Sequence, residues 1–197
     1  MVSCINCQVN IKLGGLLDLF FMSILRKMKL YLMRHGLAIE RGTLVEDSDR
    51  PLTALGKKKT QHVGQYLQKL GLNFDLIITS PLVRARQTAE IIHHQSLSRH
   101  LEVSPYLAPE GDLSEFLAWL ALHAKPEASL MAIGHQPDLG NWSEMLVYGQ
   151  IQEGIVLKKA GIIGLQLPDS GEAIAHSQIF WLTSPKLLVP KIVSKAT

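Results

Sequence analysis

The chain has 197 residues, of which 47% are hydrophobic and 19% are charged, a balance that is typical of one globular domain and excludes an intrinsically disordered chain. The formal net charge is only +3 and the basic residues are dispersed, which argues against a nucleic-acid-binding surface. Cys4 and Cys7 form a C-x-x-C pair without a second pair, so we interpret them as incidental thiols rather than as a zinc or redox site.

Residues 1–27 precede the first predicted strand, and we interpret them as an N-terminal extension. The stretch 13–25 (LGGLLDLFFMSIL) is apolar, but it contains Asp18 and is too short to span a bilayer comfortably. It also lacks the basic start and the cleavage site of a secretory signal. The alternatives for this segment are translation from an upstream start codon, a surface-lying helix and a membrane anchor. The prediction for the whole chain is a cytoplasmic protein with no membrane partner.

The folded domain is predicted to cover residues 28–185, followed by a C-terminal tail over 186–197. It begins with a short buried strand over 28–33, which is rich in Leu and Tyr. The polar stretch 37–51 is predicted to be a loop, because its composition is irregular and Pro51 restricts the residue before it to extended geometry.

A helix is predicted over 52–71, where apolar residues recur at helical spacing. Thr53 is a suitable N-cap and Gly71 a suitable stop signal for this helix. The apolar run 74–80 predicts a second buried strand. Pro81 suits the first turn of the helix that should follow it.

The predicted pattern then alternates to the end of the domain. The remaining helices are predicted over 81–95, 111–124 and 136–149, and the remaining strands within 101–107, 129–135, 160–168 and 179–184. Strands that alternate with helices indicate an α/β fold with a mainly parallel central sheet flanked by helices, that is, a three-layer sandwich.

Polar side chains follow the three clearest strands at the point where each strand ends. Arg34 and His35 follow the first strand, Arg84 lies in the helix after the second, and His135 ends the strand at 129–135. Because ligands of open α/β sheets bind at the carboxyl ends of the strands, we expect these side chains to converge on one site.

The chemistry of such a site suits a phosphoryl group, which carries about two negative charges near neutral pH. Arginine binds it through paired, charge-assisted hydrogen bonds, and helix N-termini add partial positive charge. Neighbouring cations should keep the two histidines neutral, and a neutral imidazole is a nucleophile. No carboxylate or cysteine stands beside the two histidines at ligand spacing, so no metal site is predicted.

At this point the motifs can be compared with those of known families. The segments LMRHG (32–36), SPLVRARQTAEI (80–91) and GHQPDL (134–139) resemble the histidine phosphatase superfamily, which includes the phosphoglycerate mutases. RPLTALG (50–56), APEGD (108–112) and the lack of a large insertion are similar to the compact SixA-type phosphohistidine phosphatases.

The resemblance implies a role for each matching residue. His35 resembles the nucleophilic histidine that is transiently phosphorylated, and the rest of the phosphate pocket would consist of Arg34, Arg84 and His135. Arg86 lies two residues after Arg84, about 200° around the helix, and should face elsewhere. The family also implies a phosphoglycerate mutase-like fold and a reaction without metal or other cofactors.

The proton donor is less well defined by the motifs, because the acidic inserted segment of many mutase-like members is absent. Asp47 and Glu110 are the two candidates. A strong donor matters less for a phosphohistidine substrate than for an alkyl ester. Arg50, Gly36 and Ser80 are further candidates for substrate binding.

The predicted function is that of a phosphatase which acts through a phosphohistidine intermediate on a phosphorylated protein, such as a histidine phosphotransfer domain. A phosphatase for small phosphate esters is the first alternative, and a non-catalytic phosphoprotein-binding module is the second. A serine hydrolase is disfavoured, because Ser80 is followed by Pro81 and no Gly-x-Ser-x-Gly elbow is present.

Overall fold

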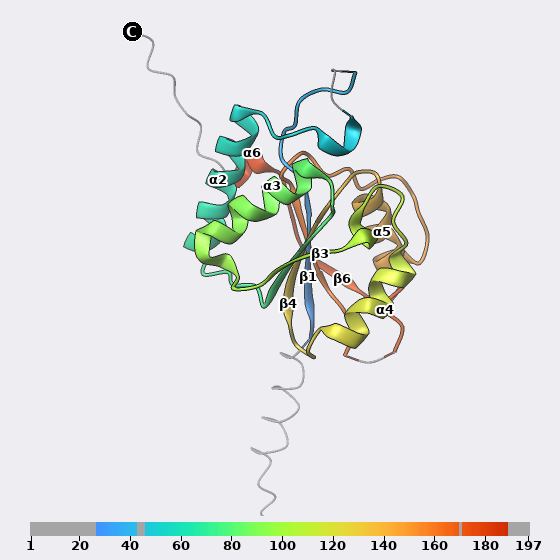
Figure 1. Cartoon of the computed structure of the whole chain (residues 1–197). Helices are drawn as coiled ribbons and strands as arrows, with labels where there is room; N and C mark the ends of the chain where they lie inside the picture. Colours follow the sequence, from blue (N-terminus) through green and yellow to red (C-terminus); the bar gives the residue numbers. More distant parts are fainter. Residues whose placement is uncertain (1–26, 43–45, 170, 189–197) are drawn as a thin grey trace, which may run out of the picture.

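The computed structural model describes residues 27–42, 46–169 and 171–188 (Figure 1). The predictions for the N-terminal extension, including Cys4 and Cys7, and for the tail beyond residue 188 therefore lie outside the described residues. Within the described ranges the elements alternate as the sequence predicts, and the α/β fold class is confirmed.

One sheet of six strands forms the centre of the molecule. The strands are β1 (Lys29–Arg34), β2 (Leu76–Thr79), β3 (Leu101–Val103), β4 (Ser129–Gly134), β5 (Ile162–Gln166) and β6 (Gln178–Thr183). Their order across the sheet is β3-β2-β4-β1-β5-β6. β1 to β4 run parallel, whereas β5 pairs antiparallel with both β1 and β6. The sheet is thus mainly parallel, as predicted.

Helices cover both faces of this sheet (Figure 1). They are α2 (Ala54–Lys69), α3 (Val83–Ile92), α4 (Leu113–His123), α5 (Asp138–Tyr148) and α6 (Pro185–Leu188). The helices α2, α3 and α6 lie on one face and α4 and α5 on the other (Figure 1). Shorter turns occur at η1 (Asp47–Asp49), η2 (His93–Leu97) and η3 (Pro105–Leu107).

The two faces of the sheet contribute to two separate hydrophobic cores because side chains alternate along each strand. On β1, Leu30 and Leu32 pack with Phe116 and Trp142 of the α4–α5 layer. Their neighbours Tyr31 and Met33 instead join the core beneath α2 and α3. With both faces covered, β1 is buried almost throughout, which explains its continuous apolar sequence.

Local capping signals explain both ends of α2 but not the start of α3. Thr53 caps α2, since its side chain accepts a hydrogen bond from the N–H of Gly56, and Gly71 follows the helix with a φ of 71°. The placement of Pro81 in the first turn of α3 is wrong, because α3 begins at Val83. The side chain of Ser80 accepts from the N–H of Leu82 at 3.3 Å and forms a turn before the helix.

Candidate active site

The carboxyl ends of β1 and β4 bring two histidines to one edge of the sheet. Arg34 pairs with Gly134 in the parallel register of these strands, so His35 and His135 follow at the same level. The N–H of His35 donates to the carbonyl of Gly134 at 3.0 Å. The centroids of the two imidazole rings are 5.2 Å apart. The convergence predicted from the sequence is therefore observed here.

The tautomer of His35 follows from its hydrogen bond. Its Nδ1 lies 2.7 Å from the carbonyl oxygen of Gly36, and a carbonyl can only accept. Nδ1 must therefore carry the proton and donate it. Nε2 is left with a free electron pair, which is the form of imidazole that can attack an electrophile.

His135 has a different hydrogen bond and therefore a different chemistry. Its Nε2 lies 2.8 Å from Oγ of Ser80, which also accepts from the N–H of Leu82 at 3.3 Å. Since Leu82 occupies an acceptor position of Oγ, the hydroxyl proton of Ser80 can point to Nε2 of His135. Nδ1 of His135 then carries a proton, and it is buried without a hydrogen-bond partner in the described part of the chain.

Two arginines next to the histidines are also incompletely paired. Arg34 donates through Nη1 to the carbonyl of Leu157 at 2.7 Å. Arg84, on α3, is only 2% exposed. The Nε atoms of Arg34 and Arg84 are buried and find no partner among the described residues. Because native proteins satisfy most buried donors, unpaired donors on Arg34, Arg84 and His135 indicate a site for an anion with several acceptor atoms.

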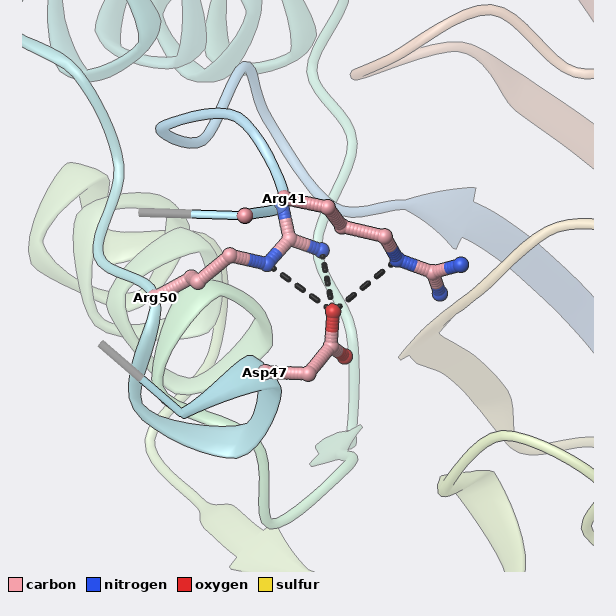
Figure 2. A pocket seen from close by; sticks show the side chains of 4 residues that line it. Arg41, Asp47 and Arg50 are labelled. Carbon is pink, nitrogen blue, oxygen red and sulfur yellow. Dashed lines mark hydrogen bonds and ion pairs between the residues drawn. The ribbon is translucent and has the colours of Figure 1, made fainter. Parts of the chain in front are cut away.

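A carboxylate connects Arg84 to two further arginines. Oδ2 of Asp47 accepts from Nη2 of Arg84 at 3.1 Å, and its main-chain carbonyl accepts from Nη1 of Arg84 at 2.6 Å. Oδ1 of Asp47 lies 2.9 Å from Nη2 of Arg50 and 3.0 Å from Nε of Arg41 (Figure 2). Burial alone would raise the pKa of Asp47, but the charges of these three arginines outweigh it and hold the pKa below its usual value.

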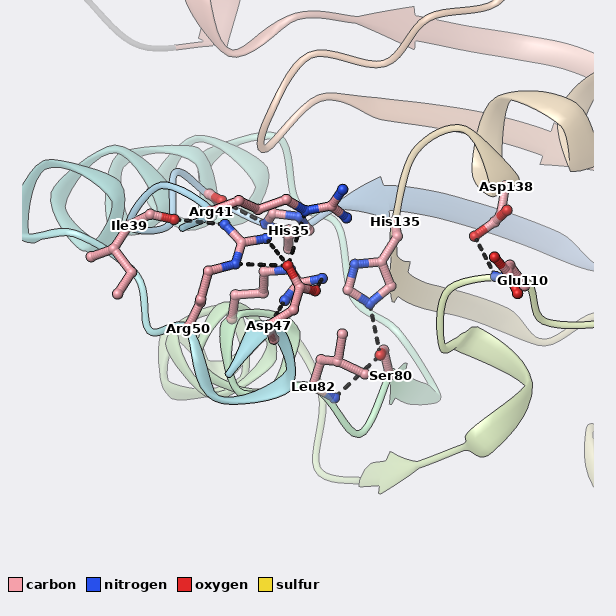
Figure 3. A network of polar contacts seen from close by, with 12 residues as sticks. His35, Ile39, Arg41, Asp47, Arg50, Ser80, Leu82, Glu110, His135 and Asp138 are labelled. Carbon is pink, nitrogen blue, oxygen red and sulfur yellow. Dashed lines mark hydrogen bonds and ion pairs between the residues drawn. The ribbon is translucent and has the colours of Figure 1, made fainter. Parts of the chain in front are cut away.

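The histidines and arginines line a pocket of about 520 Å³ at this edge of the sheet. Of the predicted site residues, the pocket is lined by Arg34, His35, Arg50, Arg84, Glu110 and His135. Figure 3 shows Asp47, Arg41 and Arg50 on one side of His135, and Glu110 with Asp138 on the other. Arg86, which was predicted to face elsewhere, is exposed.

Sequence reasoning did not single out five charged or polar residues that line this pocket: Glu40, Arg41, Gln136, Asp138 and Lys159. Gln136 and Asp138 lie inside the motif GHQPDL, so their positions next to His135 were a usable signal. Glu40, Arg41 and Lys159 lie in loops without a motif, and only the folded chain brings them to the pocket.

Gly36 and Ser80 take structural rather than pocket-lining positions. A Cβ atom on Gly36 would lie 2.5 Å from Oγ1 of Thr60, on α2, so the glycine permits close approach of this helix. The N–H of Gly36 donates to Oγ1 of Thr88 on α3 at 2.9 Å. Ser80 contacts the site through its hydrogen bond to His135.

The loop before β5 forms another wall of the pocket and is held by a buried carboxylate. Glu144, on α5, is 1% exposed and accepts hydrogen bonds from the four backbone N–H groups of residues 152–155, at 2.5 to 2.9 Å. These hydrogen bonds hold the pKa of Glu144 below its usual value. The same loop supplies Leu157, whose carbonyl binds Arg34, and Lys159.

Both histidines are held neutral in this environment. Burial is the main cause that lowers the pKa of His35 to about 3; the hydrogen bond to Gly36 opposes it, and the charges of His135, Arg84 and Arg34 reinforce it. Burial followed by the charge of Arg84 lowers the pKa of His135 to about 3. The nearby cations act as the sequence suggested, but desolvation is the larger effect.

Two further observations concern the described ranges as a whole. Among residues 27–42, 46–169 and 171–188, no three His, Cys, Asp or Glu side chains are grouped so that they could hold a metal ion. No helix in these ranges has the length and apolar character needed to cross a bilayer.

The sequence of this chain is similar to a protein-family model and to known proteins. The model of the histidine phosphatase superfamily (branch 1) matches residues 30–108. An uncharacterised protein of Picosynechococcus sp. (strain ATCC 27264 / PCC 7002 / PR-6) is 51% identical over 165 residues, which cover 83% of this chain and 100% of that protein. The phosphohistidine phosphatase SixA of Escherichia coli (strain K12) is 30% identical over 161 residues, which cover 80% of this chain and 94% of SixA.

A solved structure agrees with these sequence relatives. The structure of the protein histidine phosphatase SixA complexed with tungstate superposes with a TM-score of 0.71 and 29% sequence identity. The match covers 82% of this chain and 99% of that chain.

Proposed function

The chain belongs to the histidine phosphatase superfamily and is similar to its SixA type, and from this premise we propose that it removes phosphoryl groups from phosphohistidine on proteins through a phosphorylated His35. Family membership supports phosphatase activity as such. The single observation that carries the finer proposal is the hydrogen bond from Nδ1 of His35 to Gly36, which leaves Nε2 free beside the arginines.

In the proposed first step, Nε2 of His35 attacks the phosphorus in line with the bond to the leaving group. A new N–P bond forms on His35 while the bond to the leaving group breaks. A neutral imidazole is required for this attack, and a pKa of about 3 keeps His35 unprotonated at any pH near 7.

The unpaired donors would hold the oxygens of the phosphoryl group. Nε of Arg34, Nε of Arg84 and Nδ1 of His135 are the buried donors without partners at this pocket. Charge that develops on the oxygens in the transition state is stabilised by donors that are already in place, and one such donor is typically worth about 2.7–4 kcal/mol. Water then hydrolyses phospho-His35 and regenerates the enzyme.

The two candidate proton donors differ in their surroundings. Asp47 is paired with Arg41, Arg50 and Arg84, so its carboxylate should stay ionised and is a poor source of protons. We assign Asp47 to holding the arginines. Glu110 lies on the other side of His135, and we assign that side to the leaving group (Figure 3).

The proposed partner is a histidine phosphotransfer domain or a similar phosphorylated protein in the cytoplasm. The support is the similarity to SixA, which is a phosphohistidine phosphatase. Neither a metal ion nor another cofactor is needed in the proposed steps, because arginines and imidazole N–H groups supply the stabilising charge.

The test of the phosphoenzyme is the His35→Ala variant, with His100→Ala as a control, since His100 is exposed and outside the pocket. We expect His35→Ala to lose activity by at least about 10³-fold, since it lacks the nucleophile, while His100→Ala remains active. After mixing with ³²P-labelled substrate and an alkaline quench, label should stay on the wild type and be absent from His35→Ala. Retention of wild-type activity by His35→Ala would refute the assignment.

The substrate class is tested by comparing a phosphorylated histidine phosphotransfer domain with a panel of sugar phosphates and nucleotides. We expect a higher kcat/KM for the phosphorylated domain. A higher value for a small monoester would favour the alternative of a metabolite phosphatase, and label trapped on His35 without turnover would favour a binding module.

A further inference from the structure

The pocket has two walls of opposite hydrogen-bonding character. On one side, Arg41, Arg50 and Arg84 gather around Asp47, and their guanidinium groups offer only donors. The opposite wall is formed by Asp138 and Glu110, whose carboxylates offer acceptors (Figure 3). Phosphoryl oxygens are acceptors and fit the first wall, so the second wall faces the part of the substrate that leaves.

The backbone at the second wall is held in an uncommon conformation. Glu110 has a φ of 66°, in the left-handed region that residues other than glycine rarely adopt. Its N–H donates to Oδ2 of Asp138 at 3.1 Å. A side-chain carboxylate at the start of α5 therefore fixes the loop before α4 and keeps two carboxyl groups on the same wall. Such uncommon backbone conformations are concentrated at functional sites.

The electrostatics of this wall favour a cation. Burial raises the pKa of Asp138, the hydrogen bond from the N–H of Glu110 opposes this, and the charge of Glu110 raises the pKa further. Asp138 is half-buried, and the charge of the exposed Glu110 beside it repels its carboxylate. A positive charge placed next to them would offset both the desolvation and the repulsion.

Gln136 also lines the pocket and adds an acceptor. Its Nε2 donates to the carbonyl of Ile155 at 3.1 Å, so the atom at the other branch of the amide is the acceptor Oε1. Oε1 is buried and has no partner in the described part of the chain. A hydrogen-bond donor on the substrate would satisfy it, whereas an ether or an aromatic ring would not.

We propose that Asp138, supported by Glu110 and Gln136, binds the leaving group and selects one that carries an N–H and a positive charge, such as the protonated imidazole ring of phosphohistidine, over a neutral alcohol or phenol. The inference rests on the proposed function of the pocket and adds a specificity-determining residue to it.

The proposed contact is consistent with the chemistry of a phosphorylated imidazole. With its second nitrogen protonated, the ring carries a positive charge, and that N–H donates to the carboxylate of Asp138. When His35 attacks, the P–N bond breaks and its electron pair goes to the ring nitrogen. The ring leaves as neutral imidazole and keeps the proton on its second nitrogen, so no proton has to be transferred during the step.

The experiment compares two substrates with the full chain, phosphoimidazole and p-nitrophenyl phosphate, whose nitrophenolate leaves without a proton. The variant is Asp138→Asn, which keeps an oxygen for the N–H of Glu110 but removes the charge. We expect its kcat/KM for phosphoimidazole to fall about 10- to 100-fold, the usual worth of a hydrogen bond to a charged group, and that for p-nitrophenyl phosphate to change less than about threefold.

Glu115→Gln is the matched control, because Glu115 is an acid in the first turn of α4, as Asp138 is in α5, but does not line the pocket. It should leave both substrates unaffected. Glu110→Gln should lower turnover of phosphoimidazole selectively, which tests the wall independently of Asp138. The inference would be overturned if Asp138→Asn lowered kcat/KM equally for both substrates, or lowered it for neither. If the wild type hydrolysed neither substrate, the proposed function itself would be overturned.

Discussion

At the scale of single residues, two histidines in nearly the same surroundings are distinguished by one hydrogen bond each. Nδ1–H of His35 donates a hydrogen bond to the carbonyl of Gly36, whereas Nε2 of His135 is hydrogen-bonded to Oγ of Ser80. The first arrangement leaves a free electron pair and the second leaves a free donor. The role of each ring in the proposed mechanism is therefore set by a neighbour and not by its own chemistry.

The low pKa values of these histidines predict a pH dependence of stability. Between pH 6.5 and about 3 the unfolded chain binds protons at His35 and His135 that the folded chain does not bind. The free energy of unfolding should therefore fall as the pH is lowered through this window, with no contribution from these residues above it. Urea unfolding followed from pH 8 to pH 4 measures this.

His35→Ala provides the comparison for this prediction, since it removes one of the two groups. Its unfolding free energy should depend less steeply on pH than that of the wild type. In the wild type, the ring ¹³C and ¹⁵N signals of His35 should not titrate between pH 8 and pH 5. A titration of His35 near pH 6.5 would contradict the environment described here.

At the scale of elements, the turn η1 contributes to the site through Asp47. Its carboxylate and carbonyl together hold the two Nη atoms of Arg84, which is almost fully buried. In Asp47→Ala, Arg84 and Arg50 lose a charged partner, and we expect kcat/KM to fall by at least about 10-fold. Steady-state kinetics with p-nitrophenyl phosphate measures the loss.

Asp49→Asn is the matched control, because Asp49 lies on the same turn and has an exposed side chain that is outside the pocket. It should behave like the wild type. If Asp47→Ala were fully active, or if Asp49→Asn lost as much activity, the role of Asp47 in holding the arginines would be wrong.

Elements defined by local signals could be predicted from the sequence, and contacts between distant segments could not. The buried strands and the N-cap at Thr53 follow from neighbouring residues. The ion pairs of Asp47 with Arg84, 37 residues away, follow only from the folded chain. Gly36 illustrates the same limit, because it is Thr60 on α2 that leaves no space for a side chain at this position.

For the candidate site, the motifs pointed to residues that the fold brings together, but not to the surroundings of those residues. The strand-end rule brought Arg34, His35 and His135 together correctly, because register in a parallel sheet aligns the strand ends. Lys159 was missed because β5 is antiparallel, so the loop before this strand, and not the loop after it, reaches the pocket. No motif in the sequence signals that reversal.

At the scale of the whole molecule, the described residues between 27 and 188 form two hydrophobic cores and the pocket. A fragment that spans residues 27–188 should therefore fold and keep kcat/KM within about twofold of the full chain. Circular dichroism, thermal unfolding and kinetics of both chains check this prediction.

A shorter fragment that ends at Tyr148 should not fold, because β1 would lose its pairing with β5 and Arg34 would lose the carbonyl of Leu157. An inactive or unfolded 27–188 fragment would instead show that the terminal segments contribute to the domain.

The reversed direction of β5 has a consequence for how this architecture can diversify. Because β5 runs antiparallel to β1, the chain passes the pocket before it enters β5, whereas it passes the pocket after it leaves β1. Glu144 holds the segment before β5 through backbone N–H groups alone. Because every amino acid except proline carries a backbone N–H, the side chains at 152–155 can be exchanged for those of other residues without loss of these hydrogen bonds. Substitutions at 152–155 can therefore create binding surfaces for other substrates while the sheet and the proposed catalytic residues stay unchanged.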